Sequence, residues 1–164
     1  MTRIGILSDT HGFLDGAIFD FFKDVDEIWH AGDIGHYNVI SDLQTLGKPV
    51  RAVYGNIDDH EMRLQFPEFQ IFEVEAATIV MTHICKISGR YTSNLYHLLK
   101  KHHPHLLVCG HSHILKVNFE KSLNLLHINP GAFGKNGFHK VRTAIRLTID
   151  GTAFKDLEIL ELTR

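Results

Sequence analysis

Five short motifs in this sequence carry side chains of the kinds that bind metal ions. They supply two carboxylates, one carboxamide and four imidazoles, in the order Asp9-x-His11, Gly32-Asp33, Gly55-Asn56, His83 and Gly110-His111-x-His113. Such a set suits borderline ions such as manganese, iron, cobalt or zinc better than calcium or magnesium. Seven ligands exceed one tetrahedral zinc site, and they match two ions about 3.5–4 Å apart that share a bridging carboxylate. The motifs therefore predict a site for two divalent metal ions.

Each motif follows a segment that we predict to be a β-strand. In the first half of the chain, strands at residues 4–7, 27–30 and 50–54 alternate with helical patterns at residues 14–22 and 39–46. This β-α-β-α-β order predicts parallel strands joined by crossover helices. Because sites in such sheets form beyond the carboxyl ends of the strands, we expect the motifs to meet at one edge.

The second half of the chain is richer in strands. Residues 69–74, 77–82 and 106–109 have strand patterns, and residues 95–102 present one apolar helix face. Residues 141–149 alternate before an Asp150-Gly151 turn, which predicts a strand with one solvent-exposed face. We expect Arg142 and Arg146 on that exposed face. The whole pattern predicts two sheets packed face to face, with helices outside.

The composition fits a single domain that spans residues 1–164. The chain is 44% hydrophobic and 22% charged, with a formal net charge of −2. This balance predicts no stable nucleic-acid partner and no attraction to acidic membranes. No segment approaches the roughly 18 apolar residues of a membrane helix, and the N-terminus lacks a signal-peptide pattern, so we expect a cytoplasmic protein. Cys85 and Cys109 do not form a CxxC pair and imply no disulfide framework.

Histidine is abundant, with 13 residues spread along the chain rather than gathered in a terminal tag. Those outside the motifs lack a ligand partner nearby in the sequence, so we assign them no metal. Some of them lie on or just after the predicted helix at residues 95–102 and fit a solvated face. The others are His30, His36, His60, His127 and His139.

Taken together, the motifs resemble the calcineurin-like metallophosphoesterase superfamily. The short length and the Asn129-Pro130-Gly131 segment are similar to its small single-domain phosphodiesterase branch. The resemblance implies an α/β fold, a four-layer αββα sandwich with two central mixed β-sheets and the metal site at the carboxyl ends of the strands. It also implies that Asp33 bridges two ions. The ligands of the first ion are then Asp9, His11 and His113. The ligands of the second are Asn56, His83 and His111.

Two positions depart from the family pattern. Many members have a histidine directly after the asparagine, where it assists phosphate binding and protonation of the leaving group, but this chain has Ile57 followed by Asp58. Small phosphodiesterase relatives commonly lack that histidine as well. Thr82 stands before His83, where glycine is frequent. We therefore name Asn56, His83 and Asp58 as the candidate catalytic residues, with Asp58 as a candidate proton donor or water holder.

Each motif has a structural interpretation when it is taken alone. An aspartate after a strand is often a helix cap, and an asparagine after glycine is often a turn residue. Seven such coincidences in this order are improbable together. The alternative function is that of the retromer subunit of the vacuolar-sorting type, which is similar in fold and serves as a non-catalytic protein-interaction scaffold. A nuclease is a third reading, against which the small size and the lack of a basic stripe count.

The resemblance and the ligand chemistry lead to one mechanism. A hydroxide that bridges the two ions attacks phosphorus in line, and the ions stabilise charge on the equatorial oxygens. Two divalent ions, two carboxylates and one hydroxide leave a charge of about +1, which suits a phosphodiester monoanion. We expect a small phosphodiester substrate, with manganese as the first candidate ion and iron, zinc, nickel or cobalt as alternatives. A homo-oligomer, dimer or tetramer, is also expected from such relatives.

Overall fold

The structure, a computed structural model, describes residues 1–164. Its first sheet has the strand order β12-β11-β1-β2-β3. Three neighbouring strands run parallel, as the β-α-β-α-β pattern predicts: β1 (Thr2–Leu7), β2 (Glu27–His30) and β3 (Val50–Ala52). The C-terminal hairpin of β11 (Val141–Asp150) and β12 (Ala153–Thr163) joins antiparallel along β1, so this sheet is mixed.

The second sheet has the order β4-β5-β8-β10-β9. Its inner strands β5 (Ala77–Thr82), β8 (Leu106–Val108) and β10 (Leu125–Pro130) run parallel. The edge strands β4 (Phe69–Val74) and β9 (Leu115–Glu120) pair antiparallel with β5 and β10, so this sheet is mixed too. The bounds of β4 and β5 match those predicted from the sequence.

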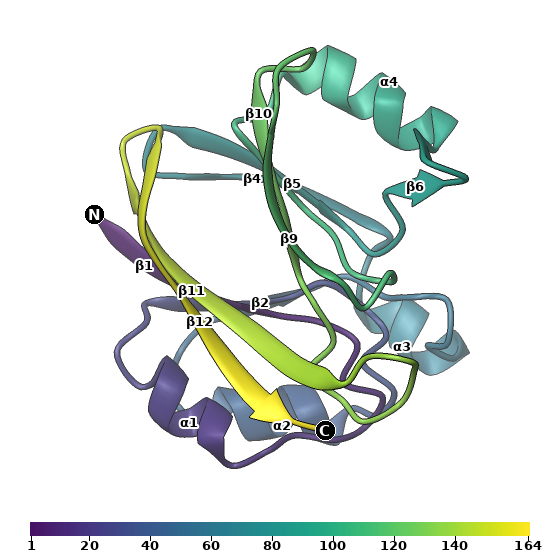
Figure 1. Cartoon of the computed structure of the whole chain (residues 1–164), viewed down its shortest axis with the longest axis vertical. Helices are drawn as coiled ribbons and strands as arrows, with labels where there is room; N and C mark the ends of the chain where they lie inside the picture. Colours follow the sequence, from purple (N-terminus) through teal and green to yellow (C-terminus); the bar gives the residue numbers. More distant parts are fainter.

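Helices cover the outer faces of the two sheets. In Figure 1, α1 (Ala17–Phe22) and α2 (Asn38–Gln44) lie below the first sheet, and α4 (Ser93–His102) lies beyond the second. A short α3 (His60–Gln65) follows β3. The hydroxyl of Thr92 accepts a hydrogen bond from the amide of Leu95 and caps α4.

A small ribbon precedes α4. Its two strands, β6 (Lys86–Ile87) and β7 (Arg90–Tyr91), pair antiparallel outside both large sheets.

Three apolar clusters hold these layers together. The largest has 15 buried residues and combines side chains of both sheets, among them Ile6 and Trp29 from the first and Ile79 and Val108 from the second. A second cluster of 13 residues packs α1 and α2 on the first sheet, and a third of 7 residues packs α4 on the second. This is the predicted four-layer α/β sandwich.

One face predicted to be solvent-exposed is covered. Arg142 is only 5% exposed, and its guanidinium lies 3.0 Å from the carboxylate of Asp15. Arg146 donates to the carbonyl oxygen of Phe21 at the end of α1. The expectation that both arginines are ordinary surface residues is wrong because α1 and the loop before it pack over this side of β11.

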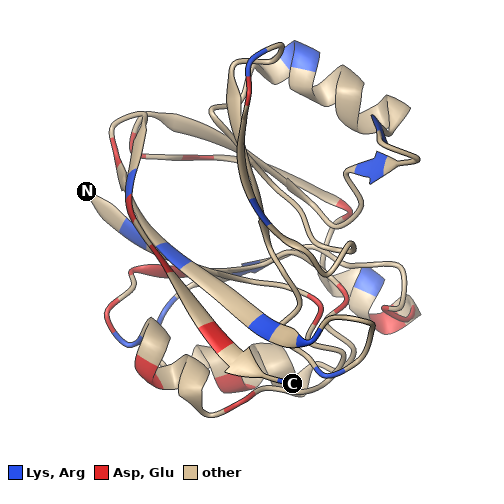
Figure 2. Ribbon diagram, viewed as in Figure 1, with Lys and Arg blue, Asp and Glu red and all other residues tan.

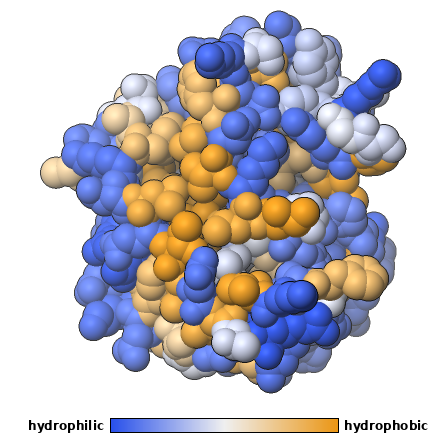
Figure 3. Space-filling model, viewed as in Figure 1, coloured by the Kyte–Doolittle hydropathy of each residue, from blue (hydrophilic) through white to orange (hydrophobic).

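The surface is mixed in charge and partly apolar. Figure 2 shows Lys and Arg interspersed with Asp and Glu, without a continuous basic stripe in that view. In Figure 3, apolar side chains gather in the middle of the same face, over the region where β9, β11 and β12 are drawn in Figure 1. Val117 and Phe119 of β9 are 44% and 53% exposed. No helix is long and apolar enough to cross a membrane. The homo-oligomer and the cytoplasmic location stay predictions.

Candidate metal centre

The five motifs meet at one edge of the two packed sheets. The loop after β1 carries Asp9 and His11, and the loops after β2 and β3 carry Asp33 and Asn56. The loop after β5 carries His83, and the loop after β8 carries His111 and His113. Among the motif residues, two groups of three side chains bring possible ligand atoms within 4.8 Å of one another, and Cys85, Cys109 and His127 form a third such group outside the motifs. The first group is Asp9, His11 and His113. The second group is Asp33, His83 and His111.

Asp33 lies where the two groups join. Its Oδ2 atom is 3.6 Å from Nε2 of His11 in the first group and 3.2 Å from Nε2 of His83 in the second. On the other side, Oδ1 of Asp9 is 3.1 Å from Nε2 of His113 and 3.8 Å from Nε2 of His83. Oδ2 of Asp33 and Oδ1 of Asp9 therefore each face imidazole nitrogens of both groups, and the Asp33 oxygen lies closer to His83.

Several of these atoms are buried without a hydrogen-bond partner. Oδ1 of Asp9 and the Nε2 atoms of His11 and His83 are all of this kind. Leaving a buried polar atom unpaired is costly, and such atoms call for an explanation when they converge. Carboxylate oxygen and imidazole nitrogen are donors suited to borderline divalent ions. The donor set and its unpaired atoms therefore fit metal ions.

The charges at the centre shift the pKa values of its members in opposite directions. Burial alone would raise the pKa of Asp33, but the neighbouring imidazole of His83 holds it below its ordinary value. Burial alone would lower the pKa of His83, but Asp33 and Asp9 raise it. Because a histidine must be unprotonated at the nitrogen that binds a metal, metal affinity is expected to rise with pH.

Five of the seven predicted ligands have left-handed backbone conformations. Their φ angles lie between 47° and 70°. They are Asp9, His11, Asp33, His111 and His113. Asp and His tolerate this region better than most residues, but each instance still costs about 1–3 kcal/mol. Such strain clusters at functional sites because it aims side chains that ordinary turns would direct elsewhere.

Two glycines allow the loops to approach this closely. A Cβ atom at Gly55 would collide with the backbone nitrogen and the carboxylate of Asp33. At Gly110 it would collide with the hydroxyl of Ser8 and lie 2.8 Å from Oδ2 of Asp9. Both glycines are therefore required by the packing of the two aspartates and not only by a turn.

Backbone groups fix the orientation of His83 and Asp33. Nδ1 of His83 lies 2.7 Å from the carbonyl oxygen of Ala31, to which it donates its proton. This assignment leaves Nε2 without a proton and facing the carboxylates. The amide of Ile57 donates to Oδ1 of Asp33 over 3.0 Å, which leaves Oδ2 free for ligation.

His139 holds His113 in a similar way, and this role was not predicted from the sequence. Nε2 of His139 lies 2.8 Å from the carbonyl oxygen of Gly134, so it carries the proton and donates it there. Its Nδ1 then accepts from Nδ1 of His113, 3.3 Å away. This chain of tautomers leaves Nε2 of His113 unprotonated toward Asp9. His139 is 26 residues from His113 and belongs to no motif, so only the fold shows the pairing.

The remaining two candidates lie beside this cluster. Asn56 is exposed and lines a hollow of about 210 Å³ together with His83, and its side chain makes no hydrogen bond within the chain. Asp58 is 3% exposed and accepts from the backbone amides of Ile34, Gly35 and Gly55. Those contacts are typical of a residue that positions loops. A role for Asp58 in proton transfer stays a prediction.

A disulfide joins the two loops that carry the histidines of the second group. Cys85 lies two residues after His83, Cys109 lies two before His111, and their sulfur atoms are bonded across a Cα distance of 6.0 Å. The sequence pattern did not imply this bond, which forms because β5 and β8 are adjacent parallel strands and residues 24 apart in sequence therefore end side by side.

Comparisons with known proteins show the family of the chain. The model of the calcineurin-like phosphoesterase superfamily domain matches residues 2–152. A probable metallophosphoesterase of Methanothermobacter thermautotrophicus is 33% identical over 134 residues, which are 79% of this chain and 76% of the relative. A phosphodiesterase of Methanocaldococcus jannaschii is 28% identical over 144 residues, covering 79% of this chain and 82% of the relative.

The fold recurs in solved structures of low sequence identity. Vps29 of Chaetomium thermophilum aligns over 99% of this chain and 98% of its own, with a TM-score of 0.78 and 12% identity. This likeness supports the fold alone. The family match covers nearly the whole chain, from β1 to the turn before β12. The chain therefore belongs to the calcineurin-like phosphoesterase superfamily.

Proposed function

We propose that this metallophosphoesterase is a phosphodiesterase that uses two divalent ions. One observation carries the proposal: Oδ2 of Asp33 faces His11 of one ligand group and His83 of the other, at 3.6 Å and 3.2 Å. A carboxylate in that position can bridge two ions, whereas a site for a single ion would use only one of the two ligand groups. Asp9, His11 and His113 would hold the first ion, and Asn56, His83 and His111 the second.

The ions would supply the chemistry that the chain lacks. Bound divalent ions lower the pKa of a coordinated water toward neutrality and stabilise charge on the phosphoryl oxygens. The chain's own residues hold this arrangement in place. The amide of Ile57 orients Asp33, and the carbonyl of Ala31 fixes the tautomer of His83. His139 does the same for His113.

The charge of the centre favours diesters. The buried carboxylates of Asp9 and Asp33 neutralise half the charge of two divalent ions. A nucleophile of charge −1 leaves a small positive excess, which matches the single negative charge of a phosphodiester. A phosphomonoester carries nearly two negative charges at neutral pH, so its binding would overcompensate the centre.

The leaving group receives no evident acid. Ile57 occupies the position after the asparagine and is 45% exposed, so an apolar side chain faces solvent where many relatives have histidine. We expect aryl leaving groups, which need no proton, to depart about 10²–10⁴-fold faster than alkyl ones, the usual contribution of general acid catalysis. Equal rates for the two under conditions where chemistry limits turnover would contradict this expectation.

The scaffold function of the retromer subunit is the competing interpretation. Fold likeness to Vps29 is compatible with it. The donor set argues for catalysis instead, since its two groups of three ligands are intact and their buried atoms are unpaired.

The test begins with metal content. Metal-free protein would be reconstituted with manganese and then with zinc, iron, nickel or cobalt, and the bound ions per chain would be measured after desalting. Activity would then be measured on bis(p-nitrophenyl) phosphate and on p-nitrophenyl phosphate. We expect two ions per chain, the highest activity with manganese, and preference for the diester.

Asp33→Asn tests the bridging role, and Asp59→Asn is its matched control. Asp59→Asn makes the same charge change at the exposed N-cap of α3, outside the centre. We expect Asp33→Asn to bind at most one ion and to lose diester hydrolysis, with Asp59→Asn unchanged. Absence of bound metal in the wild-type protein, or an active Asp33→Asn variant with two ions, would refute the proposal.

A further inference from the structure

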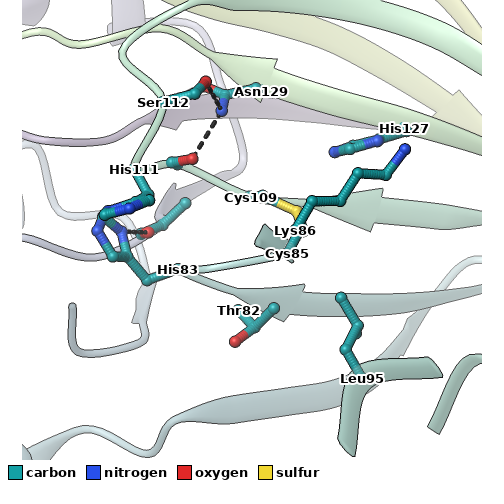
Figure 4. The surroundings of a disulfide bond; sticks show 12 residues. Thr82, His83, Cys85, Lys86, Leu95, Cys109, His111, Ser112, His127 and Asn129 are labelled. Atoms are coloured by element: carbon teal, nitrogen blue, oxygen red, sulfur yellow. Dashed lines mark hydrogen bonds between the residues drawn. A yellow bond between two sulfur atoms is a disulfide. The ribbon is translucent and has the colours of Figure 1, made fainter. Parts of the chain in front are cut away.

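A cavity of about 220 Å³ opens beside the metal centre and has no part in ligation. Gly110, His111 and Ser112 form one of its walls, so it begins at a predicted metal ligand. Lys86 and Lys116 also line it. Figure 4 shows the Cys85–Cys109 bond between His83 and His111 on one side and Lys86 and His127 on the other. We call this cavity the lysine pocket.

The lysine pocket carries positive charge. Two lysines and no carboxylate are among its lining residues. Glu120 contacts both lysines from beside the pocket, with Oε1 at 3.4 Å from Nζ of Lys86 and 3.8 Å from Nζ of Lys116. One carboxylate cannot balance two ammonium groups, so one positive charge is left in excess. The excess positive charge also acts on His127, because burial, and after it the two lysines, lower the pKa of its imidazole to about 4.

The pocket also offers hydrogen-bond capacity that the chain does not use. His127 is 4% exposed, and its Nδ1 is buried without a hydrogen-bond partner. The hydroxyl of Ser112 accepts from the amide of Ile114 and from Nδ2 of Asn129, which leaves its own proton to donate. A buried unpaired imidazole and a free hydroxyl proton beside two lysines fit an acceptor-rich anionic group.

A second hollow on the other side of the centre lacks this property. It measures about 210 Å³ and is lined by Asn56, His83, Arg63 and Glu68 among others. One arginine and one glutamate there balance in charge. The guanidinium of Arg63 is also engaged by the carbonyl oxygens of Asn56 and Asp58. Of the two hollows, only the lysine pocket is suited to a negative group.

We propose that the lysine pocket is a substrate subsite for an anionic substituent, a phosphate or carboxylate carried on one ester group of the phosphodiester. This inference rests on the proposed function and names its substrate class: diesters with a second negative charge near the scissile phosphate. At about 220 Å³ the pocket is smaller than the roughly 300–1,000 Å³ of sites for drug-sized ligands. It therefore takes a small head group, with the rest of the ester outside.

Three aryl diesters with the same leaving group test the preference. They are p-nitrophenyl butyl phosphate, p-nitrophenyl carboxypropyl phosphate and p-nitrophenyl phosphonopropyl phosphate. The quantity compared is kcat/KM for each charged substrate divided by that for the neutral butyl ester. Replacing both lysines, in Lys86→Met with Lys116→Met, should lower this ratio about tenfold, which corresponds to about 1.4 kcal/mol. The carboxylate and phosphonate arms show which anion the pocket prefers.

Two further variants keep the test interpretable. Lys100→Met with Lys101→Met makes the same charge change on the exposed side of α4, and it should leave the ratio unchanged. Lys86→Arg with Lys116→Arg keeps the positive charge and should keep the ratio. An unchanged ratio in the Lys86/Lys116 methionine variant, or an equal fall in the α4 control, would overturn the subsite.

A binding experiment on metal-free protein separates this proposal from the function on which it rests. Propylphosphonate or butyrate would be titrated while NMR follows the imidazole resonances of His127. We expect saturable shifts in the wild-type and arginine proteins and none in the methionine variant. If such shifts are seen but no diester is hydrolysed, the proposed phosphodiesterase function is refuted and the anion site remains supported. If diesters are hydrolysed but there are no shifts and no preference for charged substrates, the anion site fails and the phosphodiesterase function remains supported.

Discussion

Substitution of Asp58 distinguishes a positioning role from a catalytic role, because the two roles predict opposite effects of the same change. Its carboxylate accepts from Ile34 at 3.1 Å, Gly35 at 2.8 Å and Gly55 at 2.7 Å. Two of these amides directly follow Asp33 in the chain, and the third directly precedes Asn56. The carboxylate thus ties together the loops after β2 and β3. Asp58→Asn keeps the shape of the side chain and removes its charge.

The cost of this change follows from the three hydrogen bonds. The amide nitrogen of asparagine can accept from none of the three donors, so at least one bond is lost, and a bond to a charged group contributes about 1.5–3 kcal/mol. The other two become bonds to a neutral oxygen and lose about half their strength. Gly35 is exposed, and its freed amide can bond to water. The free energy of unfolding should therefore fall by about 2–4 kcal/mol.

Urea unfolding of metal-free protein measures this loss, and two diesters measure the consequence for catalysis. A positioning residue predicts that kcat/KM falls by the same factor for aryl and alkyl leaving groups. It also predicts that metal affinity falls and that excess metal restores part of the activity. A proton donor predicts a selective loss of about 10²–10⁴-fold for alkyl leaving groups, with stability and metal affinity intact.

Asp59→Asn is the matched control for this experiment. Asp59 is exposed and accepts one hydrogen bond, from the amide of Met62, as the N-cap of α3. Asparagine caps helices as well as aspartate does, so stability should change by less than about 0.5 kcal/mol. If Asp58→Asn is as stable as Asp59→Asn and binds metal equally well, the positioning argument fails.

Three further predictions concern other parts of the structure. The folded protein holds the pKa of His127 at about 4, below the ordinary 6.5, so the unfolded chain binds an additional proton between these values and stability falls as the pH falls through that window. In urea unfolding between about pH 4 and 6.5, the free energy of unfolding of the His127→Gln variant should fall by about 2–3 kcal/mol less than that of the wild-type protein. The same pH dependence of stability in both proteins would contradict this prediction. His139→Ala should weaken metal affinity by about 10–100-fold in a competition with a chelating dye, and unchanged affinity would remove its role in orienting His113. Stripping the metal should lower the unfolding midpoint in calorimetry, with about 2.7 kcal/mol lost for each ion that is present at 100 times its Kd, and Asp33→Asn should show a smaller shift.

Much of the fold could be predicted because its signals are local. Alternating and continuous apolar runs marked β1, β2, β4 and β5, and the order of strands and helices predicted parallel pairing. The meeting of the motifs followed from the same rule, since each lies at the carboxyl end of a strand. The ligand types were visible without any structure because metal chemistry depends on residue type and spacing.

The features that were missed depend on packing between distant segments. β9 and β10 were not predicted, although Leu115–Glu120 and Leu125–Pro130 form a regular antiparallel pair. The alternation in β9 leaves Val117 and Phe119 exposed, so its pattern does not match burial. The burial of Arg142, the disulfide and the contact between His139 and His113 likewise arise from partners far away in the sequence.

The ligand loops are held by the chain itself, which bears on how metal enters. Backbone pairing of β1 with β2 continues past the ends of both strands: the amide of Asp9 donates to Gly32 at 3.0 Å, and that of His11 donates to Asp33 at 3.0 Å. The strained φ angles of these ligands are thus held by hydrogen bonds and by the apolar clusters beneath them. Hydrogen bonds that already aim the ligands reduce the ordering that metal binding must impose on the loops. A site of this kind should therefore lose and regain its ions without unfolding of the chain.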